Sequence, residues 1–156
     1  MVTIRALTAD DAAGYLAWRG GDAYKNEVIG RELAEHFSGR RVIFVAMDGD
    51  STPVGTGQLA LVHADPDLAD GQGVAYALGL WVRDDLRGGG IGSGLMRAIE
   101  AEGVRCGCRR LTLMVEPDNT AALRLYERLG YERFKESAWV WRGKERPTLC
   151  MVKTLG

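Results

Sequence analysis

The fold is decided by the stretch Leu80-Trp81-Val82-Arg83-Asp84-Asp85-Leu86-Arg87-Gly88-Gly89-Gly90-Ile91-Gly92-Ser93-Gly94-Leu95. It continues an apolar run, Val74 to Val82, which is long enough for a strand buried on both faces. Five glycines follow within Gly88 to Gly94. Beyond them, apolar residues recur at helical spacing: Ile91, Leu95, Ala98 and Ile99. A strand, a glycine-rich turn and a helix form the geometry in which free N–H groups at a helix start hold a phosphate.

The glycines at the start of this helix narrow the choice of ligand. Gly92 and Gly94 fall in the expected first turns, where each costs about 1 kcal/mol relative to alanine. This cost suggests that the backbone closely approaches a bulky anion, and a flexible turn is the alternative. The dinucleotide fingerprint G-x-G-x-x-G fits no register, because Ser93 or Leu95 occupies the place of its last glycine. A Walker A loop is also excluded, since no Gly-Lys-Ser/Thr follows.

The segment Arg87-x-x-Gly90-x-Gly92 resembles the R/Q-x-x-G-x-G/A signature of the GCN5-related N-acetyltransferases, the GNAT superfamily. The resemblance implies that the amides of this turn bind the pyrophosphate of acetyl-coenzyme A. It also implies that a backbone N–H in the strand end, Leu80 to Val82, receives the thioester carbonyl. Gly79 either permits a bulge there or is a packing glycine. The implied cofactor-binding residues in this region are Leu80, Trp81, Val82, Arg87, Gly88, Gly89, Gly90, Ile91, Gly92 and Ser93.

A second block, Asn119 to Tyr131, resembles the family's N-x-x-A-…-L-Y-E-x-L-G-F/Y motif. The resemblance implies that Tyr126 donates a proton to the departing coenzyme A thiolate. A phenol with a pKa near 10 can hydrogen-bond and protonate a thiolate whose conjugate acid has a pKa of about 8.5. The alternative is a core tyrosine, because Tyr126 shares a helix face with Ala122. Asn119 is predicted to cap this helix, to contact the pantetheine arm as the family often does, or both.

The acceptor amine has to lose a proton before it attacks. A lysine-like ammonium with a pKa of about 10.4 is neutral in only about one molecule in 2,500 at pH 7. Amino-terminal acetyltransferases of the ribosomal-protein type place a glutamate five residues before the asparagine, where this chain has Met114. Glu116, two residues on, keeps the same strand face and is our candidate base, with a solvated carboxylate as the alternative. Less specific candidates are Asp22, Glu27 and the loop Asp65 to Asp70.

Length, composition and charge exclude several classes of protein. With 156 residues, the chain is predicted to form a single domain, residues 1–156. A net charge of −1 and the lack of a transmembrane-length apolar run argue against nucleic-acid and membrane partners. We expect a cytoplasmic protein, since the N-terminus has no basic-then-apolar signal sequence. We further expect a monomer or homodimer. Three cysteines do not suit a disulfide framework, and two histidines leave too few ligands for a metal site.

The pattern along the chain predicts an α+β (mixed α/β) fold with the order β-α-α-β-β-β-α-β-α-β-β. A strand–helix–strand crossover from Val82 to Leu111 implies two parallel strands in an otherwise antiparallel sheet. The resemblance implies the GNAT fold over essentially the whole chain, in which strands 4 and 5 splay apart around the pantetheine. The predicted strands are 2–7, 41–47, 54–62, 74–82 and 111–115, and the closing strands are read from the stretches 131–134, 138–141 and 149–152. The predicted helices are 10–18, 26–37, 91 to between 102 and 107, and one from its cap at 118–120 to Gly130.

We therefore predict an acetyl-CoA-dependent N-acetyltransferase that needs no metal and transfers acetyl directly to a primary amine of a small molecule, protein or peptide. The alternative is a non-catalytic acyl-CoA-binding module; a nucleotide-binding regulator is disfavoured by the failed glycine motifs. Family acceptor pockets are built from the first helices, the loop before the central strand and the last strands. Here these contribute Asp22, Tyr24, Glu27, Asp65, Asp67, Asp70, Trp139 and Trp141. This set suits a cationic amine, unless the aspartates form only a solvated loop.

Overall fold

The computed structural model describes residues 1–156 and contains one seven-stranded sheet with the order β1-β2-β3-β4-β5-β7-β6. The pair β4–β5 is parallel and every other neighbouring pair is antiparallel, as the crossover predicted. The strands are β1 (Val2–Ala6), β2 (Arg41–Asp48), β3 (Thr52–Ala60), β4 (Val74–Val82), β5 (Arg110–Val115), β6 (Glu132–Trp141) and β7 (Lys144–Thr154).

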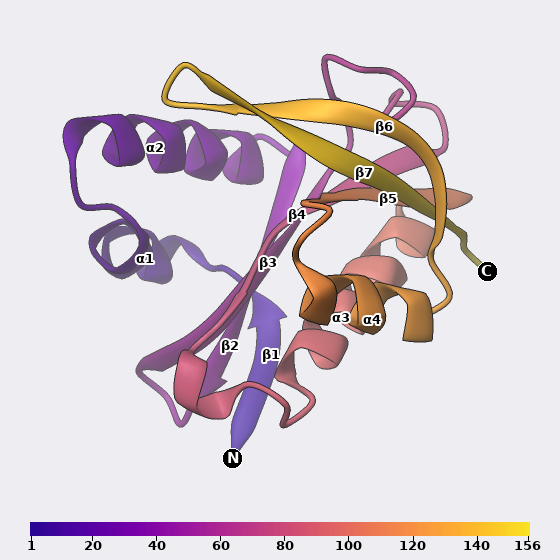
Figure 1. Cartoon of the computed structure of the whole chain (residues 1–156). Helices are drawn as coiled ribbons and strands as arrows, with labels where there is room; N and C mark the ends of the chain where they lie inside the picture. Colours follow the sequence, from indigo (N-terminus) through magenta and orange to yellow (C-terminus); the bar gives the residue numbers. More distant parts are fainter.

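Helices cover both faces of the sheet (Figure 1). One face carries α1 (Ala12–Arg19) and α2 (Ala23–Phe37), which close a core cluster of 6 buried residues. The other face carries α3 (Ile91–Arg105) and α4 (Thr120–Arg128), which close the main cluster of 16 buried residues. Two short 3-10 helices, η1 (Ala9–Asp11) and η2 (Asp84–Leu86), precede α1 and the glycine turn. None of the helices combines the length and the apolar character needed to cross a membrane.

Small residues let α3 lie close against the sheet. A Cβ added to Gly57 of β3 would be 3.0 Å from Ile99 Cδ1, and a Cβ on Gly55 would be 3.2 Å from Leu95 Cδ1. A Cβ on Gly94 would be only 2.7 Å from Ile4 Cδ1 of β1. Gly94 therefore has a packing role inside the protein, which differs from the expected approach of a bulky anion.

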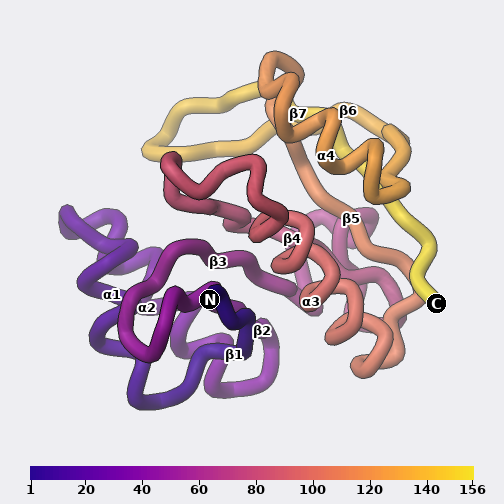
Figure 2. Tube along the Cα trace, turned by 90° about the horizontal axis from the view of Figure 1, so that it is seen from below, coloured from indigo at the N-terminus to yellow at the C-terminus, as the bar shows by residue number.

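The strands β4 and β5 separate after a short paired segment. Their register runs from Val74 opposite Arg110 to Ala77 opposite Leu113, although β4 continues to Val82. On the other side of β4, the register with β3 shifts between Thr56 and Gln58, and Gly79 adopts φ +66°. Of the two alternatives for Gly79, the bulge is confirmed. Figure 2 shows the two strands diverging, with β1 to β4 on one side and β5 to β7 on the other.

The C-terminal strands differ from the prediction. The segments 131–134 and 138–141 belong to one strand, β6, which has a bulge between Arg133 and Lys135. The polar residues between the two segments interrupt the apolar–polar alternation that is typical of a strand. They still belong to β6, because their backbone groups pair with β7. β7 is also longer than the predicted 149–152. Pro147 is tolerated inside this strand because it lies beyond the end of the β5 register at Leu149, where β7 pairs with β6 alone. A tight turn joins β6 to β7, with φ +52° at Arg142 and +76° at Gly143.

Candidate active site

The glycine turn exposes a run of unpaired backbone donors. The first intrahelical hydrogen bond of α3 runs from the Gly94 N–H to the Gly90 carbonyl, at 2.9 Å. The six amides from Gly88 to Ser93 donate to no acceptor in the chain. Gly88 and Gly90 have φ of +82° and +90°, a backbone conformation that side chains strongly disfavour. The result is a concave set of N–H groups at the positive end of a helix dipole, which is the chemistry that binds an anion.

Arg87 fixes the shape of this turn. Its Nε donates to the Val82 carbonyl at 3.1 Å, and its guanidinium pairs with Asp84 at 2.9 Å. These two contacts tie the turn to the end of β4. Arg87 is thus engaged with the protein itself, and the amides carry the free hydrogen-bonding capacity of the turn.

A cavity of about 610 Å³ runs from the glycine turn to α4. Its lining brings together most of the residues that the sequence assigned to cofactor binding: Leu80, Trp81, Val82, Arg87, Gly88, Gly90, Ile91, Gly92, Ser93 and Asn119. Gly89 belongs to the turn without lining the cavity. Arg124 and Arg128 also line it; both are exposed and have no ion-pair partner. Sequence reasoning missed them, although their i, i+4 spacing places both on one face of the helix.

A second cavity, of about 750 Å³, lies on the other side of the splayed strands and extends to α1, α2 and the β6–β7 hairpin. The two cavities share four lining residues: Leu80, Asn119, Ala122 and Tyr126. These residues come from β4 and from the start and middle of α4. The separation of β4 and β5 therefore creates one continuous site with two arms that meet at Tyr126.

Tyr126 belongs both to the core and to this junction. Its side chain is part of the main buried cluster, is 8% exposed, and packs edge-on against Tyr131 at a centroid distance of 6.0 Å. Its hydroxyl makes no hydrogen bond within the chain, and no buried side-chain polar atom lacks a partner, so this oxygen is accessible from the cavity. Burial raises the pKa of Tyr126 to about 12. The phenol is therefore neutral at physiological pH and can donate a proton or a hydrogen bond.

The two polar residues that follow β5 also line the site. Glu116 lines the second cavity, has a side chain that is 34% exposed, and pairs with Arg146 at 3.6 Å. Asn119 caps α4, since its Oδ1 accepts from the Ala122 N–H at 3.2 Å. The predicted cap is thus confirmed. The Asn119 side-chain NH₂ has no partner in the chain and lies where both cavities meet.

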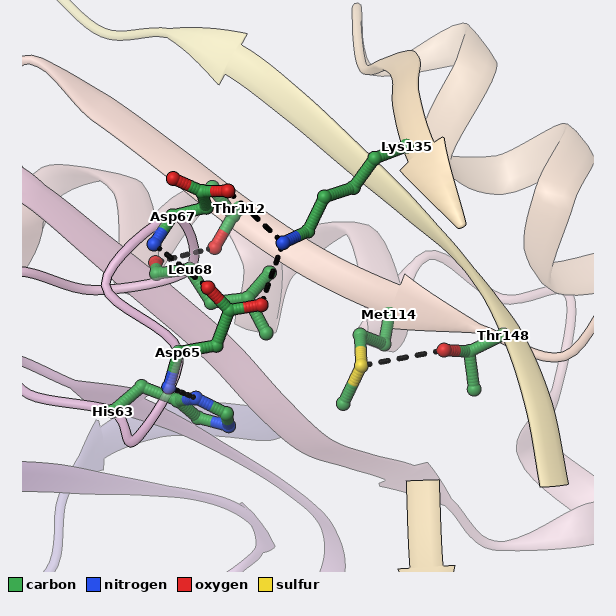
Figure 3. Close-up of polar contacts among 8 residues, drawn as sticks. All are labelled: His63, Asp65, Asp67, Leu68, Thr112, Met114, Lys135 and Thr148. Carbon is green, nitrogen blue, oxygen red and sulfur yellow. Dashed lines mark hydrogen bonds and ion pairs between the residues drawn. The ribbon is translucent and has the colours of Figure 1, made fainter. Parts of the chain in front are cut away.

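The aspartates expected in the acceptor pocket are occupied within the protein. Asp65 and Asp67 hold the Lys135 amine at 2.6 and 3.0 Å, as Figure 3 shows. Asp70 accepts from the amides of Gln72 and Val74 at 2.8 and 3.0 Å. Asp22 caps α2 and binds the Arg142 guanidinium. None of these four lines the second cavity, and neither does Glu27, whereas the expected aromatic residues do: Tyr24, Trp139 and Trp141.

Instead, the floor of the second cavity is a polar network that sequence reasoning missed. The Gln58 side chain donates to Glu32 Oε1 at 3.0 Å and accepts from Arg41 at 2.6 Å. The Tyr15 hydroxyl lies 3.1 Å from Thr56 Oγ1. The available signal was the presence of Thr56 and Gln58 inside a strand that the apolar pattern predicted to be buried. No cluster of three or more His, Cys, Asp or Glu side chains is placed to hold a metal ion.

Comparison with known proteins establishes the family. The sequence model of the Acetyltransferase (GNAT) family matches residues 8–131. The chain belongs to the GNAT family. Two curated relatives of this GNAT protein are acetyltransferases from Sodalis glossinidius and Pectobacterium atrosepticum, each 43% identical over 61 residues. The match covers 39% of this chain and 42% of each relative, so the chain spans about two fifths of the length of the curated relatives it matches.

Solved structures confirm the GNAT fold over the whole chain. A putative acetyltransferase from Salmonella typhimurium, solved with its cofactor acetyl-CoA, is similar with a TM-score of 0.76 at 19% identity, covering 100% of this chain and 95% of that one. A ribosomal-protein-alanine N-acetyltransferase from Brucella melitensis has a TM-score of 0.75 at 20% identity, covering 98% and 99%. The predicted α+β architecture with splayed parallel strands is therefore the fold of this chain.

Proposed function

We propose that this GNAT protein is an acetyl-CoA-dependent N-acetyltransferase that transfers acetyl directly to a primary amine in a ternary complex. The observation that carries the proposal is the meeting of two cavities at Tyr126, one reached from the glycine turn and one from α1 and α2. Such a site can hold a long donor in one arm and an acceptor in the other. Family membership and the names of the curated relatives support the acetyl donor.

The proposed donor position follows the unpaired polar groups. The pyrophosphate lies over the amides from Gly88 to Ser93, and Arg124 and Arg128 provide cations for the coenzyme phosphates. The pantetheine arm passes between the end of β4, at Leu80 to Val82, and Asn119 on α4. Because Gly79 and Leu80 have no register partner on either neighbouring strand, a backbone N–H here can receive the thioester oxygen.

The proposed chemistry is aminolysis of a thioester. The amine nitrogen attacks the acetyl carbonyl carbon, the C–N bond forms, and the C–S bond breaks. The proton that leaves the amine goes to a base, for which Glu116 is the carboxylate at the end of β5. The thiolate receives the Tyr126 proton, and solvent then restores the phenol. The neutral phenol, with its raised pKa, mainly stabilises the developing thiolate by hydrogen bonding before the proton moves.

The test is a panel of primary amines incubated with the protein and acetyl-CoA, read by thiol release and by mass-spectrometric detection of the N-acetylated product. Amine-dependent thiol release with a matching product supports the proposal. Tight binding of acetyl-CoA by calorimetry with no amine-dependent thiol release across the panel supports the non-catalytic acyl-CoA-binding module instead. Reactions without amine measure thioester hydrolysis and provide the baseline.

A further inference from the structure

Arg19, at the end of α1, is a cation without an ion-pair partner. Its guanidinium lies 4.8 Å from the centroid of the Trp81 ring and 5.3 Å from that of Trp18, and the two rings pack edge-on at 5.5 Å. The side chain is partly buried and forms no ion pair and no hydrogen bond within the chain. Stacking on aromatic rings fixes the guanidinium and leaves its five N–H donors free. An arginine held in this way is prepared to bind an anion at low entropic cost.

The anion is not a phosphate of the coenzyme in the proposed binding mode. Arg19 lines the second cavity and is absent from the lining of the cavity that starts at the glycine turn. The free amides from Gly88 to Ser93 and the two arginines of α4 belong to that other cavity. A planar, bidentate donor on the acceptor side instead fits a carboxylate carried by the acceptor.

Glu32 of α2 supplies the opposite charge on the same wall. One of its carboxylate oxygens accepts from the Gln58 amide at 3.0 Å, and the carboxylate has no ion-pair partner. The Tyr15 hydroxyl lies near both charges. Burial raises the pKa of Tyr15, the charge of Glu32 raises it further, and the charge of Arg19 lowers it. The same Gln58 amide also donates to the Tyr15 hydroxyl at 3.5 Å, so Glu32 and Tyr15 are joined at the cavity floor, and Arg19 lines the same cavity.

The outer end of the cavity is aromatic. Trp141 packs edge-on against Tyr24 at 5.0 Å and stacks on Trp139 at 5.6 Å. Arg142 is bound to Asp22 and lies over Tyr24 and Trp141, which holds the hairpin tip against α2. The charge of Asp22 is thus neutralised, and the aromatic wall offers apolar surface to a side chain.

We propose that the acceptor is a free α-amino acid with an apolar side chain. Arg19 binds its carboxylate, Glu32 attracts its ammonium group, and Tyr24, Trp139 and Trp141 contact its side chain. The proposal rests on the N-acetyltransferase function proposed above. The products are then an N-acetylamino acid and free coenzyme A, with the C–N bond formed, the C–S bond broken, and the amine proton taken up by the base.

The experiment compares amino acids with their primary amides, using L-leucine, L-methionine and L-phenylalanine as probes. The amide lacks the carboxylate charge. Its amine is also less basic than that of the acid, so a larger fraction of it is neutral at neutral pH. If the enzyme does not recognise the carboxylate, the amide is therefore the better substrate. We expect kcat/KM for the acid to exceed that for the amide by about 10- to 100-fold, because a hydrogen bond to a charged group is worth roughly 1.5–3 kcal/mol. Equal or greater activity on the amides or on peptide amino termini would overturn the inference.

Substitutions at Arg19 test whether this residue causes the preference for the acid over the amide. Arg19→Gln is expected to lower kcat/KM for the acids to or below that for the amides, and so to abolish the preference for the acid. Arg19→Lys retains part of the preference, since it keeps the charge without the planar fork. Arg40→Gln, at an exposed arginine outside both cavities, is the matched control and keeps the full preference. Glu32→Gln is expected to lower activity on acids and amides alike, because both carry the ammonium group.

Two readouts separate the inference from the proposed function. Circular dichroism and the acetyl-CoA dissociation constant of each variant show that the fold and the donor arm are intact. If amines are acetylated and Arg19→Gln does not alter the acid-to-amide ratio, the inference fails and the N-acetyltransferase function stands. If no amine is acetylated, the proposed function fails and the inference fails with it.

Discussion

Tyr126 illustrates how one side chain can serve both the core and the site. We expect Tyr126→Phe to lower kcat by about 10²–10⁴-fold when proton transfer limits the rate, because the ring and its packing on Tyr131 are kept and only the hydroxyl is lost. The acetyl-CoA dissociation constant should be unchanged. The acid form exists below the raised pKa of about 12 and is lost above it, so deprotonation of Tyr126 should not lower the rate at pH 7 to 10. A wild-type kcat in the variant would show that Tyr126 serves only in core packing and does not donate the proton.

Glu116 is the residue-scale test of the base. The Glu116→Gln substitution keeps the shape of the side chain and removes its proton-accepting capacity. We expect kcat/KM to fall and the acidic limb of the pH–rate profile to change, because that limb reports the free enzyme's base. Arg146→Gln removes the ion-pair partner of Glu116 while keeping the carboxylate, and it should retain activity. A profile that Glu116→Gln leaves unmoved would place the base elsewhere, with Glu32 of α2 as the next carboxylate.

At the scale of the elements, local patterns were predictable and long-range pairings were not. The strand, glycine turn and helix from Val74 onward were predicted because hydrophobic period and glycine spacing are local properties. The continuity of β6 was missed because its polar middle is stabilised by pairing with β7, which a linear pattern does not contain. The roles of the aspartates were also missed: their partners Lys135 and Arg142 lie 70 and 120 residues away in sequence.

The start of α3 offers a test that preserves the fold. Gly92 has a helical backbone, and an added Cβ would lie 3.7 Å from Leu125 and 3.9 Å from Val82, which are ordinary contacts. We expect Gly92→Val to fold and to weaken acetyl-CoA binding sharply, because the larger side chain enters the donor cavity. Gly30→Val in α2, where an added Cβ meets nothing within 4 Å, is the matched control for helix propensity. If calorimetry gives the same acetyl-CoA affinity for both variants and the wild type, the coenzyme does not bind at this turn.

The loop before β4 is attached to β6 by one lysine. Lys135 binds Asp65 and Asp67, and the buried Thr112 hydroxyl donates to the Leu68 carbonyl at 2.6 Å beneath the same loop (Figure 3). We expect Lys135→Gln to accelerate amide hydrogen exchange at Leu68 and Ala69, whose N–H groups both bond to the Asp65 carbonyl. Lys144→Gln, at an exposed lysine without an ion pair, should leave this exchange unchanged. Equal exchange in both variants would show that Thr112 and the loop backbone hold the segment without the lysine.

At the scale of the whole molecule, the sheet consists of two parts joined by a short seam. Only the register from Val74–Arg110 to Ala77–Leu113 connects β1–β4 with β5–β7 directly. The main core cluster bridges the seam from the side of α3 and α4, with Ala77 and Leu113 among its members. The open part of the seam is where both cavities meet. A ligand bound there contacts both parts, so its binding free energy adds to the stability of the whole domain.

We therefore expect acetyl-CoA to stabilise the protein globally. At a free concentration of 100 times the dissociation constant, binding adds about 2.7 kcal/mol. For a domain of this size each kcal/mol raises the Tm by roughly 2–4 °C, which gives a shift of about 5–10 °C in a calorimetric or fluorescence melt. Gly92→Val at the same ligand concentration should show little of this shift. Hydrogen exchange should locate the protection at Gly88 to Ser93, whose amides are unpaired in the free protein. Stabilisation by ATP but not by coenzyme A would favour a nucleotide-binding regulator and contradict the acetyltransferase proposal.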